Sequence, residues 1–348
     1  MTALAELLGV EHPIVLGPFG GVSSVALVAA VSDAGGLGSY GLYGYDAARI
    51  ADTAAQLRAA TDRPFALNLW LPTGDEVTPD AVDLEQARAA VAPFFAELGL
   101  EEPALPDAFL PPFEEQAAAV LDARPAVLSL VFGVPPRALV DEAHARGIVV
   151  VGAATTVEEA VALEAGGVDA VVATGMEAGG HRVAFLRPPE ESLVGTFALV
   201  PQVVDAVGIP VIAAGGIADR RGVAAAFALG ARGVQVGTAF LATRESAAPP
   251  SHRAALPGTA PNATVLTRAM SGRVARGIPN RALRTIEESG AIAPFPAQNW
   301  LTGRFRAVAA QRDRADLLSL WAGQSAALSR DAPAADVFAE LAAGLPAR

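Results

Sequence analysis

The sequence predicts an α/β protein, a closed (β/α)8 TIM barrel with an additional, mostly helical lobe. Short apolar segments alternate with longer segments rich in alanine, leucine and arginine, which is the pattern of a parallel sheet with connecting helices. Eight such units can be counted, and this number favours a closed barrel over an open sheet. No G-x-G-x-x-G motif follows the first strand, which weakens the case for a dinucleotide-binding sheet. The strands are predicted at residues 14–16, 37–40, 65–70, 126–132, 148–152, 168–173, 210–214 and 234–236.

Hydroxyl and carboxylate side chains mark where several of the connecting helices begin. Such side chains accept hydrogen bonds from the first free N–H groups of a helix, so they are favoured immediately before it. Candidate caps precede four helices: Ser23 or Ser24 before residues 25–33, Asp46 before the helix that ends near 60, Thr155 or Thr156 before the helix that ends at 164, and Asp219 before residues 221–229.

The alternation of predicted strands and helices is interrupted in two places. Residues 71–112 are rich in proline, aspartate and glutamate, with one helical stretch at about 79–98, and we interpret them as an insertion over the mouth of the barrel. After Glu245 the chain consists of loops and helices without a strand rhythm. We therefore expect a barrel domain at residues 1–245 and a helical lobe at residues 246–348. The lobe is expected to cover the barrel mouth and to return to the barrel at its C-terminal end.

Composition and charge restrict the classes of function. The chain of 348 residues is 52% hydrophobic and contains no cysteine, so disulfide bonds and thiolate chemistry are excluded. The net charge of −12 argues against nucleic acid or an anionic membrane as a partner. No basic segment followed by a long apolar core opens the chain, and no apolar run reaches the length of about 20 residues that spans a bilayer. These features predict a soluble, cytoplasmic protein.

Two successive predicted strands end in glycine. Gly215 and Gly216 follow the strand at 210–214, and Gly237 and Thr238 follow the strand at 234–236. Glycine lets backbone N–H groups approach an anion closely, and the loops after strands seven and eight of a barrel often hold phosphate. Tight turns and close packing would also explain one glycine pair. Two pairs at neighbouring strand ends favour a phosphate site.

Of the four histidines, His181 alone directly follows a predicted barrel strand, on a loop with Gly179 and Gly180 before it. Catalytic residues of such barrels lie at this end of the strands. A neutral imidazole there can take a proton from an acidic carbon, and an imidazolium can hold an anion. No second histidine and no pair of carboxylates stands at a spacing typical of metal ligands, so no metal is expected.

Several motifs in order resemble the nitronate monooxygenase family, formerly called 2-nitropropane dioxygenases. The motifs are PFGGVSS, VSDAGGLGSYG, LNLW, MEAGGHR, AAGGIADRRG, VQVGTAFLATRES, SGRVARGIPN and WAGQ, which together extend over nearly the whole chain. The resemblance implies a barrel that binds FMN and a helical second domain. It also implies oxidation of an alkyl nitronate, or a nitroalkane, by O2 to a carbonyl compound and nitrite. The small-molecule substrate and O2 are then the partners, and a homo-oligomer is compatible with this family.

The resemblance assigns roles to individual residues. His181 matches the catalytic histidine, which deprotonates a nitroalkane or steadies the anionic nitronate. Glu177 is expected to cap backbone groups rather than to bind the ribityl chain. The matching cofactor positions are Gly215, Gly216, Gly237 and Thr238 for the phosphate of FMN, Gly17, Asn68 and Gln324 near the flavin ring, and Gly180 as a small residue beside the ring.

The sequence differs from the family pattern at one place, and two alternative functions remain open. Residues 182–184 read Arg-Val-Ala, where a glycine often follows the arginine in the family, so the substrate is not determined. An FMN-dependent NAD(P)H reductase of the same superfamily, acting on enoyl thioesters or quinones, shares the glycine and histidine motifs. A flavin-binding barrel without catalysis is the second alternative, although such a protein would have no use for His181.

Overall fold

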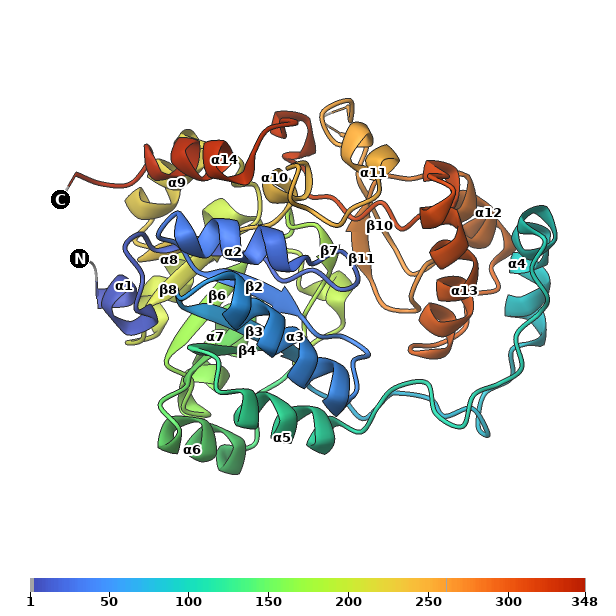
Figure 1. Cartoon of the computed structure of the whole chain (residues 1–348), viewed down its shortest axis with the longest axis horizontal. Helices are drawn as coiled ribbons and strands as arrows, with labels where there is room; N and C mark the ends of the chain where they lie inside the picture. Colours follow the sequence, from blue (N-terminus) through green and yellow to red (C-terminus); the bar gives the residue numbers. More distant parts are fainter. Residues whose placement is uncertain (1–2, 261, 348) are drawn as a thin grey trace.

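The computed structural model describes residues 3–260 and 262–347, and its centre is one parallel sheet of eight strands (Figure 1). The strand order is β1-β9-β8-β6-β5-β4-β3-β2. A parallel bridge between Val15 and Leu37 joins the two ends of this order, so the sheet closes into a barrel and the predicted fold is confirmed. The strands are β1 (Ile14–Leu16), β2 (Gly38–Gly41), β3 (Phe65–Trp70), β4 (Val127–Val131), β5 (Val149–Ala154), β6 (Ala170–Thr174), β8 (Val211–Ala214) and β9 (Gly233–Val236).

Helices surround the barrel, and four of them begin at predicted capping residues. Ser24, Asp46, Thr156 and Asp219 each accept a hydrogen bond from the first turn of the helix that follows. Ser23 has a different role, because its hydroxyl donates to the carbonyl of Phe19 and accepts from the N–H of Gly41. The surrounding helices are α2 (Val25–Asp33), α3 (Ala47–Ala60), α5 (Phe113–Ala123), α6 (Arg137–Ala145), α7 (Val157–Ala165), α8 (Thr196–Ala206) and α9 (Arg220–Ala228).

The interior of the barrel is filled by side chains. Small and β-branched residues from alternating strand positions pack against the apolar side chains of α1 (Ala3–Leu8). A cavity of about 10 Å³ is lined by these residues, among them Leu8. The barrel is therefore a packed core and not a channel, and a ligand has to bind at the open ends of its strands.

A second hydrophobic core lies beside the barrel. It combines α4 (Glu85–Leu98), from the insertion, with α12 (Arg281–Ser289) and α13 (Ala297–Gln311), from the C-terminal part of the chain. Figure 1 shows α4 next to α12 and α13, joined to the barrel by two long extended segments. Phe94 of α4 and Phe305 of α13 are both fully buried, with ring centroids 5.3 Å apart. The insertion and the tail thus share one core.

The helix in the insertion is shorter than predicted, because it begins at Glu85 and not near residue 79. Residues 78–81 form a turn, in which the N–H of Ala81 donates to the carbonyl of Thr78. Asp83 accepts a hydrogen bond from the N–H of Glu85. Short acidic side chains compete in this way for backbone N–H groups and favour helix starts over helix interiors.

The C-terminal part also contains strands, contrary to the prediction of loops and helices alone. β10 (Val265–Thr267) and β11 (Ala275–Gly277) pair antiparallel, and β11 pairs with β7 (Gly180–His181) from the loop after β6. Strands of two or three residues are too short to produce an alternating pattern in the sequence. The small sheet connects the barrel mouth to the second core and places His181 opposite Ala275.

The last helix, α14 (Ala334–Ala342), lies against the barrel beside α2 and α9 (Figure 1). Phe338 is buried there, and Glu340 forms an ion pair with Arg220 of α9. Among the helices described, none is both long and apolar enough to cross a membrane.

Candidate active site

The two predicted glycine loops lie at neighbouring strand ends, after β8 and β9. Gly215 and Gly216 have φ angles of +103° and +73°, a region that favours glycine. Gly237 directly precedes the short helix α10 (Thr238–Leu241). Within the described residues, the N–H groups of Gly216 and Thr238 have no backbone or side-chain acceptor. These groups are thus available to an anion.

The segment at residues 321–325 crosses both glycine loops. The N–H of Gly323 donates to Thr238 Oγ1 at 3.0 Å, and Ser325 Oγ donates to the carbonyl of Gly216 at 2.7 Å. Gln324 lies between them, with its N–H donating to the carbonyl of Glu177 and its side chain exposed. The structure therefore brings Gly215, Gly216, Thr238 and Gln324 together.

Glu177 acts as a cap. Its carboxylate accepts hydrogen bonds from the N–H of Thr196, at 2.9 Å, and from Thr196 Oγ1, at 2.9 Å. Thr196 begins α8, whose preceding residue, Gly195, provides no side-chain cap. The predicted capping role is therefore the one that the structure shows.

Gly17 directly follows β1, and Asn68 lies in β3, two residues before its end. A Cβ atom on Gly17 would lie 3.1 Å from the Cα of Gly237, so the first and last loops of the barrel touch here. Asn68 is 2% exposed, and its amide nitrogen donates to Ser129 Oγ at 2.8 Å. Among the described residues, none donates to its side-chain oxygen. Asn68 therefore retains an unused acceptor close to the mouth.

His181 lies between two tryptophan side chains. Its ring centroid is 4.9 Å from that of Trp70, at the end of β3, and 5.4 Å from that of Trp321. Burial, together with the positive charges of Arg273 and Arg306, lowers the pKa of His181 from 6.5 to about 3. The imidazole is therefore neutral at physiological pH. Gly180, next to it, has a φ of +75°, and a Cβ there would meet no atom within 4 Å.

Ser271 is the hydrogen-bond partner of His181 Nε2. Ser271 Oγ lies 2.8 Å from His181 Nε2, donates to the carbonyl of Arg273 at 3.1 Å and accepts from the N–H of Arg273 at 3.3 Å. A hydroxyl has one proton to donate. If that proton goes to the carbonyl, Ser271 accepts from His181 Nε2–H and Nδ1 is unprotonated; if it goes to Nε2, the proton of the imidazole is on Nδ1.

Arginine side chains surround the histidine. Arg182, the residue after it, is 1% exposed and donates to the carbonyls of Thr174, Gly175 and Ser192, so it holds the loop after β6 in place. Arg273 stacks on Phe295, 3.9 Å from the ring centroid, and forms ion pairs with Asp75 and Glu76 of the insertion. The insertion therefore reaches the candidate site through Arg273.

Sequence reasoning assigned no role to several of these side chains. Trp70, Ser271 and Trp321 stand within the motifs that carry the family resemblance, but nothing in a motif shows that three distant segments meet around one imidazole. Arg306 follows from no motif, because it is one of several arginines in a helical segment. That Arg306 lies near His181 can be seen only in the tertiary structure, where α13 packs beside the barrel.

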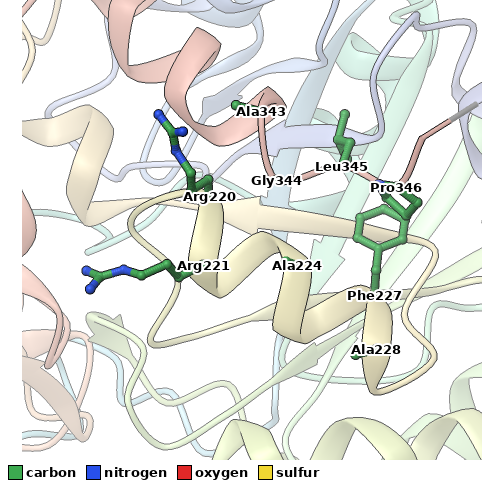
Figure 2. A pocket seen from close by; sticks show the side chains of 9 residues that line it. All are labelled: Arg220, Arg221, Ala224, Phe227, Ala228, Ala343, Gly344, Leu345 and Pro346. Carbon is green, nitrogen blue, oxygen red and sulfur yellow. The ribbon is translucent and has the colours of Figure 1, made fainter.

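A surface groove between α9 and the C-terminal segment is separate from this site. Figure 2 shows it lined by Phe227, Leu345 and Pro346, with Arg220 and Arg221 at one end. None of the predicted site residues lines it, and both arginines are already paired, Arg220 with Glu340 and Arg221 with Asp219. In the described part of the chain, no three histidine or carboxylate side chains are grouped so that they could hold a metal ion.

Known proteins are similar to this chain in sequence and in fold. The family model described as nitronate monooxygenase matches residues 1–344. A probable nitronate monooxygenase of Staphylococcus aureus (strain Newman) is 38% identical over 340 residues, which cover 97% of this chain and 95% of the relative.

Two solved structures are also similar to this chain. Nitroalkane oxidase from Streptomyces ansochromogenes has a TM-score of 0.85 and 37% sequence identity, and the match covers 98% of this chain and 97% of that chain. FabK from Thermotoga maritima has a TM-score of 0.76 and 31% identity, over 98% of this chain and 94% of that chain. The fold, the arrangement around His181 and these similarities lead to one conclusion: the chain belongs to the nitronate monooxygenase family of oxidoreductases.

Proposed function

We propose that this protein uses FMN and O2 to oxidise alkyl nitronates to a carbonyl compound and nitrite. Its family membership supports the oxidation of nitronates at the level of the family. The observation that carries the proposal for this chain is the environment of His181. A neutral imidazole lies between two tryptophan rings, in the field of two arginines. This arrangement suits a small anion whose reacting carbon lies beside the histidine.

The glycine loops fit the phosphate of FMN. The N–H groups of Gly216 and Thr238 lack protein acceptors among the described residues, and a Cβ on Gly216 would come no closer than 3.7 Å to another protein atom. Two donors for a phosphate are therefore present. When bound, FMN supplies the redox chemistry. Gly17, Asn68, Gly180 and Gln324 are proposed to lie near its ring, with the free oxygen of Asn68 as an acceptor.

His181 is proposed to orient the substrate and to accept a proton when the substrate arrives as a neutral nitroalkane. Ser271 is proposed to support this role: with its own proton on the carbonyl of Arg273 it accepts from His181 Nε2–H, which leaves Nδ1 free to accept. A group with a pKa of about 3 is a weak base at neutral pH. A nitronate has already lost the proton in question. We therefore expect preformed nitronates to be oxidised faster than the corresponding nitroalkanes.

The test is flavin absorbance in the absence of O2. FMN-loaded enzyme is mixed with propionate 3-nitronate in one cuvette and with NADH or NADPH in another. Rapid loss of the oxidised flavin spectrum with the nitronate, and no change with either nicotinamide, is the expected result. Nitrite released after O2 is admitted provides the second measurement.

The opposite result would identify the NAD(P)H reductase. Bleaching by a nicotinamide alone would contradict the proposal and direct the search to quinone or enoyl acceptors. Bleaching by neither compound would favour the flavin-binding barrel without catalysis. A protein that binds no flavin at all would exclude all three functions.

A further inference from the structure

Residues 321–325, here called the strap, are held at both ends by buried groups. Trp321 pairs with Gly277 through an antiparallel bridge, and its carbonyl oxygen lies 3.1 Å from Nε2 of the buried His252. Ala326, directly after the strap, is fully buried. The course of the strap is therefore fixed on both sides of the residues that contact the candidate site.

Between these ends, the strap packs against the loop after β6 without room for a side chain. A Cβ on Gly323 would lie 2.7 Å from the carbonyl oxygen of Glu177, and a Cβ on Gly179 would lie 2.5 Å from the backbone nitrogen of Gly323. Glycine at both positions lets the two backbones touch. The N–H of Gln324 donates to the carbonyl of Glu177 at 2.9 Å. The strap is thus fastened to the loop that leads to His181.

The strap also engages acceptor atoms of the two glycine loops. The N–H of Gly323 donates to Thr238 Oγ1, and Ser325 Oγ donates to the carbonyl of Gly216. Within the described residues, the hydroxyl proton of Thr238 has no acceptor, and the N–H groups of Gly216 and Thr238 have none either. Acceptors at these strand ends are therefore occupied while donors remain free, and this combination favours an anion.

Ser325 differs from the rest of the strap because its contact depends on a side chain. Gly323 and Gln324 use backbone N–H groups, which any residue other than proline would retain. The carbonyl that Ser325 holds belongs to Gly216, whose φ is +73°. Glycine has more backbone freedom than any other residue, so a hydrogen bond to this carbonyl restricts a segment that would otherwise move easily.

We propose that Ser325 is a positioning residue for the phosphate of the cofactor, and that the strap sets how tightly this phosphate is held. Ser325 acts through Gly216: while its hydroxyl holds the carbonyl, the glycine keeps the conformation in which its N–H is free to donate. A donor that is already in position loses less conformational entropy when an anion binds. This inference rests on the proposed function for the identity of the cofactor, and not for the substrate.

The test compares FMN with riboflavin, which lacks the phosphate. In Ser325→Ala, the dissociation constant of FMN is expected to rise about 3- to 10-fold, the effect of losing one hydrogen bond. The dissociation constant of riboflavin should stay within about twofold of the wild-type value. Equilibrium dialysis of the whole chain against each flavin gives both constants. Release of FMN after dilution, followed by flavin fluorescence, should be faster in the variant.

Two further variants serve as controls. Ser325→Thr keeps the hydroxyl and should retain the FMN affinity of the wild type. Ser289→Ala removes a hydrogen bond of the same kind, because Ser289 Oγ donates to the carbonyl of Ile286 at 2.6 Å, but it lies in α12, within the second core. It should leave the binding of both flavins unchanged.

Three results would overturn the proposal. The first is equal FMN affinity in Ser325→Ala and in the wild type. The second is an equal loss of affinity for FMN and riboflavin, which would indicate a general disturbance of the mouth. The third is a loss in Ser325→Thr as large as in Ser325→Ala, since the hydroxyl would then have no role.

The failure of this inference is distinguishable from the failure of the proposed function, because no substrate enters the binding measurements. A protein that binds FMN more weakly in Ser325→Ala, and yet does not react with a nitronate, would refute nitronate oxidation and support the role of Ser325. A protein that oxidises nitronates, and binds FMN equally well with and without the hydroxyl, would refute the role of Ser325 alone.

Discussion

At the scale of single residues, the chemistry depends on how the protein keeps His181 neutral. Burial and two nearby cations disfavour the imidazolium, and Ser271 Oγ lies 2.8 Å from Nε2 of the neutral ring. The same two cations favour an anion at the same place. The positive charges of the two arginines therefore have two consequences: they keep the histidine unprotonated, and they attract a negatively charged substrate.

Replacing His181 by asparagine should separate two roles of this residue. Because asparagine cannot accept the substrate proton as a base, turnover of neutral nitroalkanes is expected to fall by about 100-fold or more. Preformed nitronates need no deprotonation, so their oxidation should fall much less. The measurement is kcat/KM for nitroethane and for ethyl nitronate, with FMN content determined by absorbance. An equal loss for both substrates, with FMN retained, would contradict a role as base.

At the scale of elements, the ends of β8 and β9 combine free N–H groups with unusual backbone angles. Gly216 has a φ of +73°, at which a side chain is strained, and it faces the space where we propose that phosphate binds. A larger residue at position 216 would strain the backbone and would also weaken the binding of phosphate. A control is needed that reproduces the strain alone.

The chain offers such a control in Gly147, which also has a φ of +73° and open space around it, but lies between α6 and β5. Each of Gly216→Val and Gly147→Val should cost about 1–2 kcal/mol of stability. FMN affinity should fall about 10- to 100-fold in Gly216→Val alone, because one charge-assisted hydrogen bond to the phosphate is lost. Equilibrium dialysis with FMN measures this loss, and riboflavin, which lacks the phosphate, should bind both variants alike. Equal FMN affinity in the two variants would exclude Gly216 from the phosphate site.

Elements that repeat a pattern could be predicted from the sequence, and elements that depend on distant partners could not. The barrel strands are continuous apolar runs and four helices have capping side chains, so both are readable locally. β7 has two residues, and it is a strand only because β11 lies beside it. The surroundings of His181 were missed for the same reason. Trp70, Ser271 and Trp321 are far apart in the chain, and their meeting is a property of the tertiary structure.

At the scale of the whole molecule, buried neutral histidines make stability depend on pH. His252 is 2% exposed, its Nε2 lies 3.1 Å from the carbonyl of Trp321, and burial lowers its pKa to about 4. In the unfolded chain its pKa returns to about 6.5. Between these two values the unfolded state binds more protons than the folded state. Stability therefore falls as the pH decreases through this range.

The contribution of His252 can be isolated by substitution. Between pH 7 and pH 5 the wild-type protein should lose about 2 kcal/mol of stability from this residue, and His252→Gln should lack this part of the decrease. Urea unfolding at the two pH values, with FMN absent, provides the measurement. His144→Gln, which changes a much more exposed histidine, is the control. If the loss of stability between pH 7 and pH 5 is the same in His252→Gln as in the wild type, His252 is protonated in the folded protein.

The second core also sets an order of events during synthesis. α4 has its packing partners in α12 and α13, so residues 99–311 must be made before this core can close. At about 5–20 residues per second, the delay is roughly ten to forty seconds. During that time Phe94 and Phe95, which are buried in the finished protein, have none of these partners. A ribosome-bound chain that stops before α13 should therefore recruit chaperones through α4, and one that has released α13 should not.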